Sequence, residues 1–169
     1  LNKPRGYVTT LSDEKGRPDV AGLVADCGAR VYPVGRLDMD SEGLLLLTND
    51  GALTQRLLHP SFRIDKTYEV DVSGFRPGSA AALSAVRELD GEPVSPAQVT
   101  VLSRSGERAR LSVVIHEGKN RQIRRMCAQC GLTVRRLRRV QEHTLSLGSL
   151  PPGKWRYLTR EELDALSGE

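Results

Sequence analysis

Short strand-like runs, interrupted at irregular intervals by helix-like runs, limit most strongly what this chain can fold into. In residues 68–72, three apolar side chains alternate with two acidic ones, as in a strand with one buried face. Other apolar or alternating runs predict further extended segments, over residues 7–11, 30–34, 44–47, 98–102, 110–116, 134–140 and 144–147. Because strands outnumber helices, the sequence predicts an α+β fold with a mixed, mostly antiparallel sheet and flanking helices.

Capping and stop residues mark the predicted helices. Thr159 with Glu162 three residues later is a capping box that begins the last helix. Gly28 and Gly131 are typical helix stops. Further helices are predicted over residues 18–26, 51–58, 77–89 and 120–130. The 169 residues suffice for one domain, and we expect two halves within it, residues 1–62 and 63–169.

Several classes of protein are disfavoured by what the sequence lacks. No apolar run approaches the ~20 residues of a membrane-spanning helix, and no signal peptide is visible. Three cysteines cannot all pair with one another, which favours a reducing, cytoplasmic setting. Cys127 and Cys130 form a CxxC without a second pair, so two small helix residues are favoured over a zinc or redox site. The chain begins at Leu1, and we expect a further segment upstream of it.

Positive charge is concentrated in one segment. The formal net charge is +4, but residues 119–139 contain eight basic residues and no acidic one, which leaves −4 for the remainder. A focused basic face is typical of a protein that binds a polyphosphate such as nucleic acid. A solvated helix face, or a set of ion pairs within the protein, is the alternative.

An acidic loop bounded by glycines occupies residues 35–43. It contains Asp38, Asp40 and Glu42, directly before the apolar run at residues 44–47. A loop mounted on a buried strand is a usual place for catalytic carboxylates, and an acidic surface turn is the alternative. A metal site is disfavoured because no calcium-loop spacing is present. No phosphate-binding Gly-rich loop or nucleophile elbow occurs, so no cofactor is indicated.

A second polar cluster occupies residues 117–126. Arg121 and Arg125 lie one turn apart on the predicted helix, and Arg124 lies on the neighbouring face. One arginine of this cluster could hold a phosphate while another reaches a carboxylate. A solvent-facing basic helix is the alternative.

Five motifs in a fixed order resemble those of a known family. They are Asn2-Lys3-Pro4-Arg5-Gly6, Gly35-Arg36-Leu37-Asp38, Gly43-Leu44-Leu45-Leu46, Lys66-Thr67-Tyr68 and Gly118-Lys119-Asn120-Arg121-Gln122-Ile123-Arg124-Arg125-Met126. This set resembles the bacterial ribosomal-RNA pseudouridine synthases, and within them the large-subunit rRNA enzymes. The resemblance covers nearly the whole chain and ends at residues 152–156. Members of this branch often carry an N-terminal RNA-binding domain, which these residues do not include.

The resemblance implies a reaction and a catalytic set. One uridine in ribosomal RNA is detached from its ribose, turned and rejoined through carbon, without a cofactor or a metal. The family's essential aspartate falls on Asp38, which attacks the substrate or removes a sugar proton. Its matching arginine falls on Arg124, which keeps the carboxylate charged. Its active-site tyrosine falls on Tyr68, whose ring stacks on the base and whose hydroxyl can assist a proton transfer. The implied fold is the pseudouridine synthase fold, with a central active-site cleft.

The resemblance and the charge pattern together imply RNA contacts. Arg36 resembles the residue that fills the space left by a uridine flipped out of a helix. Leu137 is a candidate wall of the base pocket. The implied partner is ribosomal RNA or an assembling ribosomal subunit, bound by a monomer. The candidate phosphate contacts are Lys3, Lys119, Arg121, Arg125, Arg135, Arg136, Arg138 and Arg139.

Two other functions remain open from the sequence. A non-catalytic RNA-binding or ribosome-assembly module would use the same basic segment and need no carboxylate. Such a module would gain nothing from acidic residues that repel RNA. A metal-dependent nuclease would use the carboxylates of residues 38–42, although their spacing suits a metal poorly.

Overall fold

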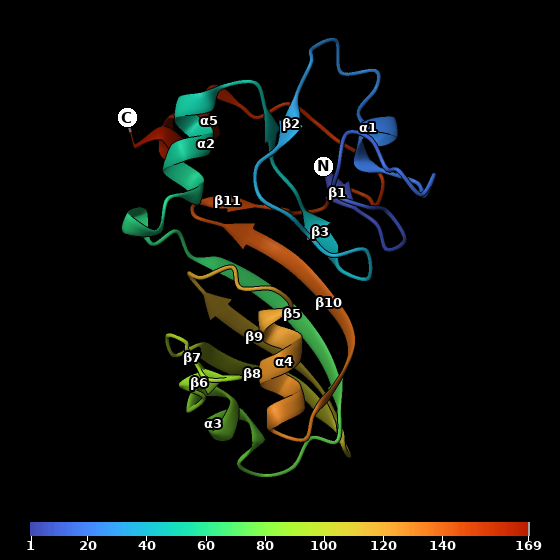
Figure 1. Cartoon of the computed structure of the whole chain (residues 1–169). Helices are drawn as coiled ribbons and strands as arrows, with labels where there is room; N and C mark the ends of the chain where they lie inside the picture. Colours follow the sequence, from blue (N-terminus) through green and yellow to red (C-terminus); the bar gives the residue numbers. More distant parts are fainter. Residues whose placement is uncertain (169) are drawn as a thin grey trace. The chain divides into compact units, whose positions relative to one another are not determined.

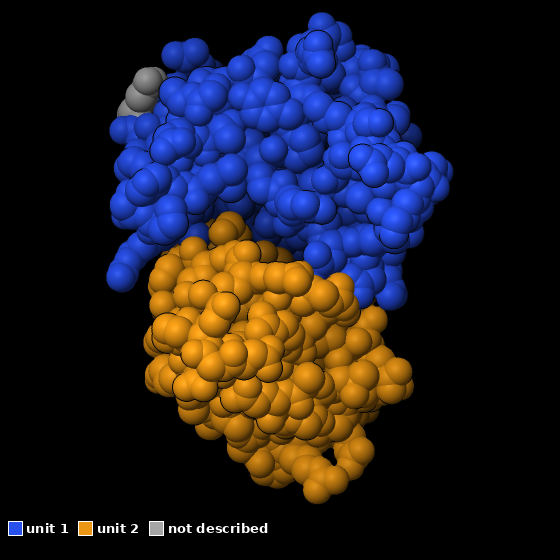
Figure 2. All heavy atoms as spheres, viewed as in Figure 1, with its two compact units in different colours: residues 1–64, 139–169 blue, residues 65–138 orange. Residues whose placement is uncertain are grey.

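The computed structural model describes residues 1–168, which form two compact units (Figure 2). Unit 1 contains Leu1–Ile64 and the chain from Arg139 onward, and unit 2 contains Asp65–Arg138. The first boundary falls close to the expected division after residue 62. The expectation that all later residues form the second half is wrong, because the chain returns to unit 1 at Arg139.

Unit 1 is built from short elements (Figure 1). Strands β1 and β3 pair antiparallel, with Lys3 opposite Gly43, and β2 pairs antiparallel with β4. Helix α2 begins at Asp50, whose side chain accepts hydrogen bonds from the backbone of Ala52 and Leu53. The predicted capping box begins α5. The elements are β1 (Asn2–Lys3), α1 (Val20–Leu23), β2 (Tyr32–Pro33), β3 (Glu42–Leu44), β4 (Leu47–Thr48), α2 (Gly51–Leu58), a 3₁₀ turn η1 (Pro60–Phe62), β11 (Leu145–Ser146) and α5 (Arg160–Ser167).

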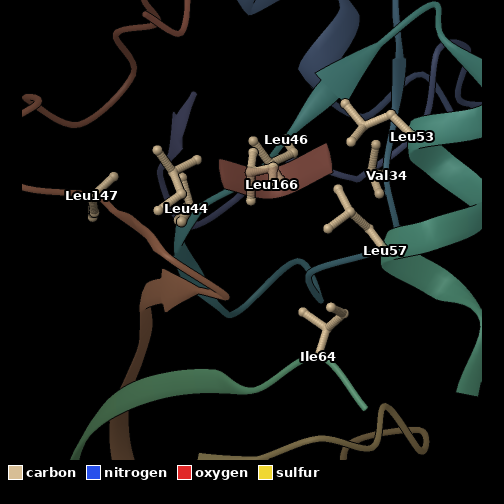
Figure 3. Close-up of a cluster of buried hydrophobic side chains, with 9 residues drawn as sticks. Val34, Leu44, Leu46, Leu53, Leu57, Ile64, Leu147 and Leu166 are labelled. Atoms are coloured by element: carbon tan, nitrogen blue, oxygen red, sulfur yellow. The ribbon is translucent and has the colours of Figure 1, made fainter. Parts of the chain in front are cut away.

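The hydrophobic core of unit 1 explains why the C-terminal segment belongs to it. Leu145, Leu147 and Leu166 are buried in one cluster with side chains from residues 34–64 (Figure 3). Helices α2 and α5 also pack against each other. Burying a leucine side chain contributes roughly 1.5–3 kcal/mol, so these late residues hold the end of the chain on unit 1. The cluster contains Val34, Leu44, Leu46, Leu53, Leu57, Ile64, Leu145, Leu147 and Leu166.

Unit 2 is an antiparallel sheet with helices packed against it. Its strand order is β10-β5-β9-β8, with Tyr68 of β5 opposite Val113 of β9. The alternation predicted for residues 68–72 is confirmed, and helix α4 lies across the sheet (Figure 1). The elements are β5 (Lys66–Ser73), α3 (Ser79–Ser84), β6 (Glu88–Leu89), β7 (Glu92–Pro93), β8 (Gln98–Ser105), β9 (Arg108–Ile115), α4 (Gln122–Gln129) and β10 (Thr133–Glu142), whose last four residues belong to unit 1.

Four predicted elements differ from the structure. Residues 7–11 form no strand and make only an isolated bridge between Val8 and Asp19. The apolar run at residues 44–47 is divided between β3 and β4, each with its own partner. The helix expected over residues 18–26 is limited to α1. The helix expected over residues 77–89 ends at Ser84, because the next residues form the β6–β7 hairpin. Within residues 1–168, no helix has the length and apolarity needed to cross a membrane.

Candidate active site

The backbone of the loop that carries Asp38 is held from several sides. The Thr9 hydroxyl donates to the Leu37 carbonyl at 2.6 Å and accepts from the Leu37 amide at 3.2 Å. The Gly6 amide donates to the Met39 carbonyl at 2.8 Å, and the Ser41 amide closes a turn on the Asp38 carbonyl at 3.0 Å. These bonds fix residues 37–41 without using the Asp38 carboxylate. The loop therefore presents a half-buried Asp38 on a preorganised backbone.

Lys3 supplies the innermost contact to this loop. Its side chain is fully buried, and Nζ donates to the carbonyl oxygens of Pro4, Asp38 and Ser41 at 3.1, 3.0 and 2.7 Å. Burial lowers the pKa of Lys3 to about 8, although the nearby carboxylates, Asp40 foremost, oppose that change. This burial contradicts the expectation that Lys3 contacts phosphate. Lys3 holds the Asp38 loop instead.

The lowered pKa of Lys3 predicts a pH-dependent stability. Between pH 8 and the ordinary lysine pKa of 10.5, the unfolded chain binds more protons at Lys3 than the folded chain. The Lys3 contribution to the free energy of unfolding should therefore rise with pH across this window, by at most about 3 kcal/mol, and be flat below it. The buried Cys127 thiol, whose pKa is raised to about 12, contributes an opposite fall above pH 9 that is common to all variants, so the Lys3 rise is the difference between the wild type and Lys3→Met. Lys3→Met should remove this rise. Urea denaturation from pH 7.5 to 10.5 measures it.

Lys15→Met is the matched control, because Lys15 is exposed. It should keep the wild-type rise. The α-amino group of Leu1 has a pKa lowered to about 6 by burial, so its contribution falls below pH 8 and outside this window. A Lys3→Met profile that parallels the wild type across pH 8–10.5 would contradict this role for the buried ammonium.

Directly after the loop, β3 runs in close contact with β10. A Cβ atom on Gly43 would lie 2.2 Å from the Arg139 carbonyl oxygen and 2.7 Å from its nitrogen. Arg139 itself is 3% exposed, and its Nε donates to the Leu44 carbonyl at 2.9 Å. This burial contradicts the expectation that Arg139 is a phosphate contact. Gly43 and Arg139 join the end of the Asp38 loop to β10.

In unit 2, the structure brings Tyr68 and Leu137 to the same face of the sheet. Arg138 of β10 contacts Glu69 of β5 with an Nη2–Oε1 distance of 2.7 Å. Side chains alternate along a strand, so the preceding residues, Leu137 and Tyr68, point to the opposite face. Both are largely buried, at 6% and 9% exposure. Arg36 belongs to unit 1, where it is exposed two residues before Asp38.

Arg124 lies on α4, at the end of a rigid loop. It is half-buried, beside the buried Ile123. The Glu117 carboxylate accepts from the Ser95 amide at 2.8 Å and from Gln122 Nε2 at 3.0 Å. Gln122 Oε1 in turn accepts from the Lys119 amide at 3.1 Å. The turn before α4 is thus fixed by side chains on both sides, which orients the residues that follow.

Arg121 is the N-terminal cap of α4 and has a left-handed backbone, with φ 50° and ψ 36°. This conformation is uncommon for a residue with a side chain and is concentrated at functional sites. The Arg121 side chain is exposed. The role of Arg121 in RNA binding stays a prediction.

The basic segment is not one continuous patch. Lys119 pairs with Glu92 at 3.5 Å, and Arg125 pairs with Asp90 at 2.6 Å. Arg138, paired with Glu69, points to the sheet face opposite Tyr68. Arg136 is two residues before Arg138 on β10, so its side chain points to the same face of the sheet. Both arginines line a small depression together with Glu69, Asp71 and Arg110. Part of the charge expected to contact phosphate is therefore neutralised by acidic side chains or directed to another face.

The CxxC cysteines behave as small helix residues. Cys127 is fully buried on α4, and burial raises its pKa to about 12. Cys27, Cys127 and Cys130 are all free thiols. Within residues 1–168, no three histidine, cysteine or acidic side chains are grouped so as to hold a metal ion.

Burial predicts that Cys127 reacts slowly with thiol reagents, because the reactive species is the thiolate. In the native protein at pH 7.5, the half-buried Cys130 should react first with Ellman's reagent, since Cys27 is 7% exposed, although burial raises the pKa of Cys130 as well. All three thiols should react in urea. Rapid reaction of three thiols in the folded protein would contradict the packing of α4.

Comparison with known proteins identifies the family of this chain. Residues 1–129 match the family model described as RNA pseudouridylate synthase. The chain belongs to this family. Its activity is therefore that of an RNA pseudouridine synthase, which isomerises uridine within RNA. The motifs that resembled the bacterial enzymes are thus confirmed at the level of the family.

Curated relatives agree along nearly the whole chain. The ribosomal large subunit pseudouridine synthase B of Bacillus subtilis is 40% identical, over 98% of this chain and 69% of its own length. The ribosomal large subunit pseudouridine synthase E of Xanthomonas campestris is 42% identical, over 92% of both chains. An uncharacterized RNA pseudouridine synthase of Mycobacterium tuberculosis is 41% identical, over 98% of this chain and 67% of its own length.

Solved structures confirm the fold. A crystal structure of a pseudouridylate synthase matches with a TM-score of 0.87 and 32% identity, over 98% of this chain and 71% of that one. An archaeal box H/ACA Nop10–Cbf5 complex matches with a TM-score of 0.59 and 17% identity, over 86% of this chain and 47% of that one. The second likeness concerns the fold alone. The predicted α+β class and pseudouridine synthase fold are confirmed.

Several supporting residues have no signal in the sequence. Thr9 holds Leu37 from 28 residues away, and Glu117 with Gln122 builds the turn before α4. Glu117 and Gln122 both lie in the polar cluster at residues 117–126, but their contact to each other cannot be read from the sequence. Thr9 lies in a run that the sequence predicts as a strand. Only the structure shows that these side chains position the candidate residues.

Proposed function

We propose that this RNA pseudouridine synthase modifies one uridine in the RNA of the large ribosomal subunit. The B. subtilis and X. campestris relatives carry that substrate in their names and align with nearly all of this chain. The observation that carries the proposal is the Asp38 loop, whose backbone is clamped by Thr9, Lys3 and Gly6.

Three residues form the proposed catalytic set. Asp38 acts on the uridine, as nucleophile or as the base that removes a sugar proton, and both roles require its ionised form. Arg124 is the cation that keeps this carboxylate charged. Tyr68 stacks on the base, and Leu137 on the same sheet face supplies an apolar wall. No oxidation and no second substrate are involved, because the base leaves and rejoins the same ribose.

RNA binding is assigned to the basic residues that keep an exposed or half-exposed side chain. Flipping the uridine out of a helix costs a few kcal/mol in lost stacking, and Arg36 occupies the space that the uridine leaves. Arg121 and Arg135 contact phosphates, and Lys119 and Arg125 do so by exchanging the Glu92 and Asp90 carboxylates for phosphate. Arg136 and Arg138 serve only RNA that passes the opposite face of the unit 2 sheet. The protein acts as a monomer on rRNA or on an assembling subunit, in the cytoplasm, where its three free thiols stay reduced.

The experiment uses tritium release from RNA labelled at carbon 5 of uridine, because that tritium is lost when carbon 5 becomes the glycosidic atom. Large-subunit and small-subunit rRNA transcripts are compared, each alone and during assembly with ribosomal proteins. Release confined to large-subunit RNA is expected. Release only from small-subunit RNA would contradict the substrate assignment, and release from none of the four would contradict the proposed function.

A further inference from the structure

An exposed aromatic ring stands in a basic setting on unit 1, outside the residues assigned above. Phe62 is the last residue of η1 and is 47% exposed. The Arg56 guanidinium carbon lies 5.2 Å from the centre of its ring, and the His59 ring meets it edge to face at 6.2 Å. Residues 56–63 contain two arginines and no acidic residue. The ring is therefore an exposed apolar face with one guanidinium in contact with it.

The ring is held in place from both ends of its turn. Leu57 and Ile64, which flank the turn, are buried in the unit 1 core (Figure 3). Within the turn, His59 Nδ1 accepts from the Ser61 amide at 3.2 Å, and the Phe62 amide donates to the His59 carbonyl at 3.1 Å. A fixed aromatic ring loses little conformational freedom when it binds a ligand.

The guanidinium that contacts the ring is itself fixed. Arg56 Nε donates to the Leu166 carbonyl at 2.9 Å, which ties α2 to α5. This bond holds the Arg56 side chain against one side of Phe62. A ring beside such an arginine suits a ligand that has both a flat π-face and a negative backbone.

The turn also lies near the loop that carries Asp38. A Cβ atom on Gly35 would lie 3.4 Å from Leu58 Cδ2, so Leu58 packs against the residue that precedes Arg36. Asp38 is three residues beyond Gly35, a chain distance of about 10 Å at most. Leu58 therefore links the end of α2 to the segment that leads to Asp38.

We propose that Phe62 is a stacking platform for an unpaired base of the RNA substrate, with Arg56 and Arg63 attracting its phosphates. This inference rests on the proposed function and adds a binding position to it. A nucleotide fits this position because it has both an aromatic base and a phosphate, whereas a purely apolar partner would not need the arginines. Stacking tolerates any base, so the position adds affinity rather than sequence choice.

The test compares Phe62→Leu with Phe62→Trp in binding a fluorescent single-stranded decauridylate. Phe62→Leu should weaken binding about tenfold without changing its salt dependence, because a stacked base is lost and no charge is. Phe62→Trp should keep the affinity, and its added indole fluorescence should be quenched by the RNA, with the wild type correcting for Trp155. Melting temperatures verify that the variants are folded.

A matched control and an activity assay distinguish the possible failures. Leu102→Ala removes an apolar side chain of similar exposure, 51%, on β8 and should leave binding unchanged. In tritium release, Phe62→Leu should raise KM with little change in kcat. If Phe62→Leu binds RNA with wild-type affinity, or if Phe62→Trp loses as much affinity as Phe62→Leu, Phe62 is not a stacking platform. The proposed function still stands in that case, provided that the wild-type protein releases tritium. Wild-type protein that binds RNA through Phe62 but releases no tritium contradicts the proposed function instead.

Discussion

Asp38→Asn should lower the rate of tritium release by at least about a thousandfold, while RNA binding and the folded structure are retained. The amide has nearly the shape of the carboxylate but can neither attack carbon nor take a proton. The Lys3, Gly6 and Thr9 contacts that fix the loop all go to backbone atoms or to Thr9 itself, so they survive the substitution. The measurement is single-turnover tritium release together with a binding titration.

Asp40→Asn is the matched control for Asp38→Asn. It removes the same charge from the same loop, and Asp40 is also half-buried. Its rate should fall by less than about tenfold, because the charge is lost but the reacting group is kept. Equal losses in both variants would mean that the loop acts through its total charge. Normal turnover in Asp38→Asn would show that the reacting group lies elsewhere.

Gly43→Ala should have the largest effect on stability, with the free energy of unfolding reduced by more than about 3 kcal/mol. The added methyl group would stand 2.2 Å from the Arg139 carbonyl oxygen, and backbone atoms cannot move aside as a flexible side chain can. Gly43 also has a φ of +110°, which side chains with a Cβ rarely adopt. Urea denaturation measures the loss, and failure of the variant to fold is its extreme form.

Gly91→Ala separates the two causes of that loss. Gly91 has a φ of +83° in the β6–β7 turn, but a Cβ there would meet nothing within 4 Å. It should lose only the conformational part, about 1–2 kcal/mol. A Gly43→Ala variant as stable as Gly91→Ala would contradict the close approach of β3 to β10.

Local patterns predicted the elements whose stabilising contacts are local. The capping box of Thr159 and Glu162 begins α5 as expected, and the alternation at residues 68–72 is a strand with Tyr68, Val70 and Val72 buried. The β6–β7 hairpin, which overlaps the end of the helix expected at 77–89, also had a local signal. Asp90-Gly91 is a typical turn of a two-residue hairpin, and both residues have positive φ.

Features that depend on distant partners could not be read from the sequence. The motif containing Lys3 was identified, but its burial follows from carbonyl groups 35 and 38 residues away. The basic segment was found, yet the acids that neutralise part of it, Asp90 and Glu69, lie 35 and 69 residues from their arginines. The return of the chain to unit 1 depends on the packing of Leu147 and Leu166 with residues 34–64, which no local pattern shows.

The central claim is that the protein isomerises uridine inside intact RNA. The most direct measurement is chromatography of nucleosides from large-subunit rRNA after incubation with the wild-type protein, with gel electrophoresis of the same RNA. We predict that pseudouridine appears at the expense of uridine and that the RNA keeps its full length. RNA that is shortened, or that is bound but contains no new pseudouridine, would contradict the account.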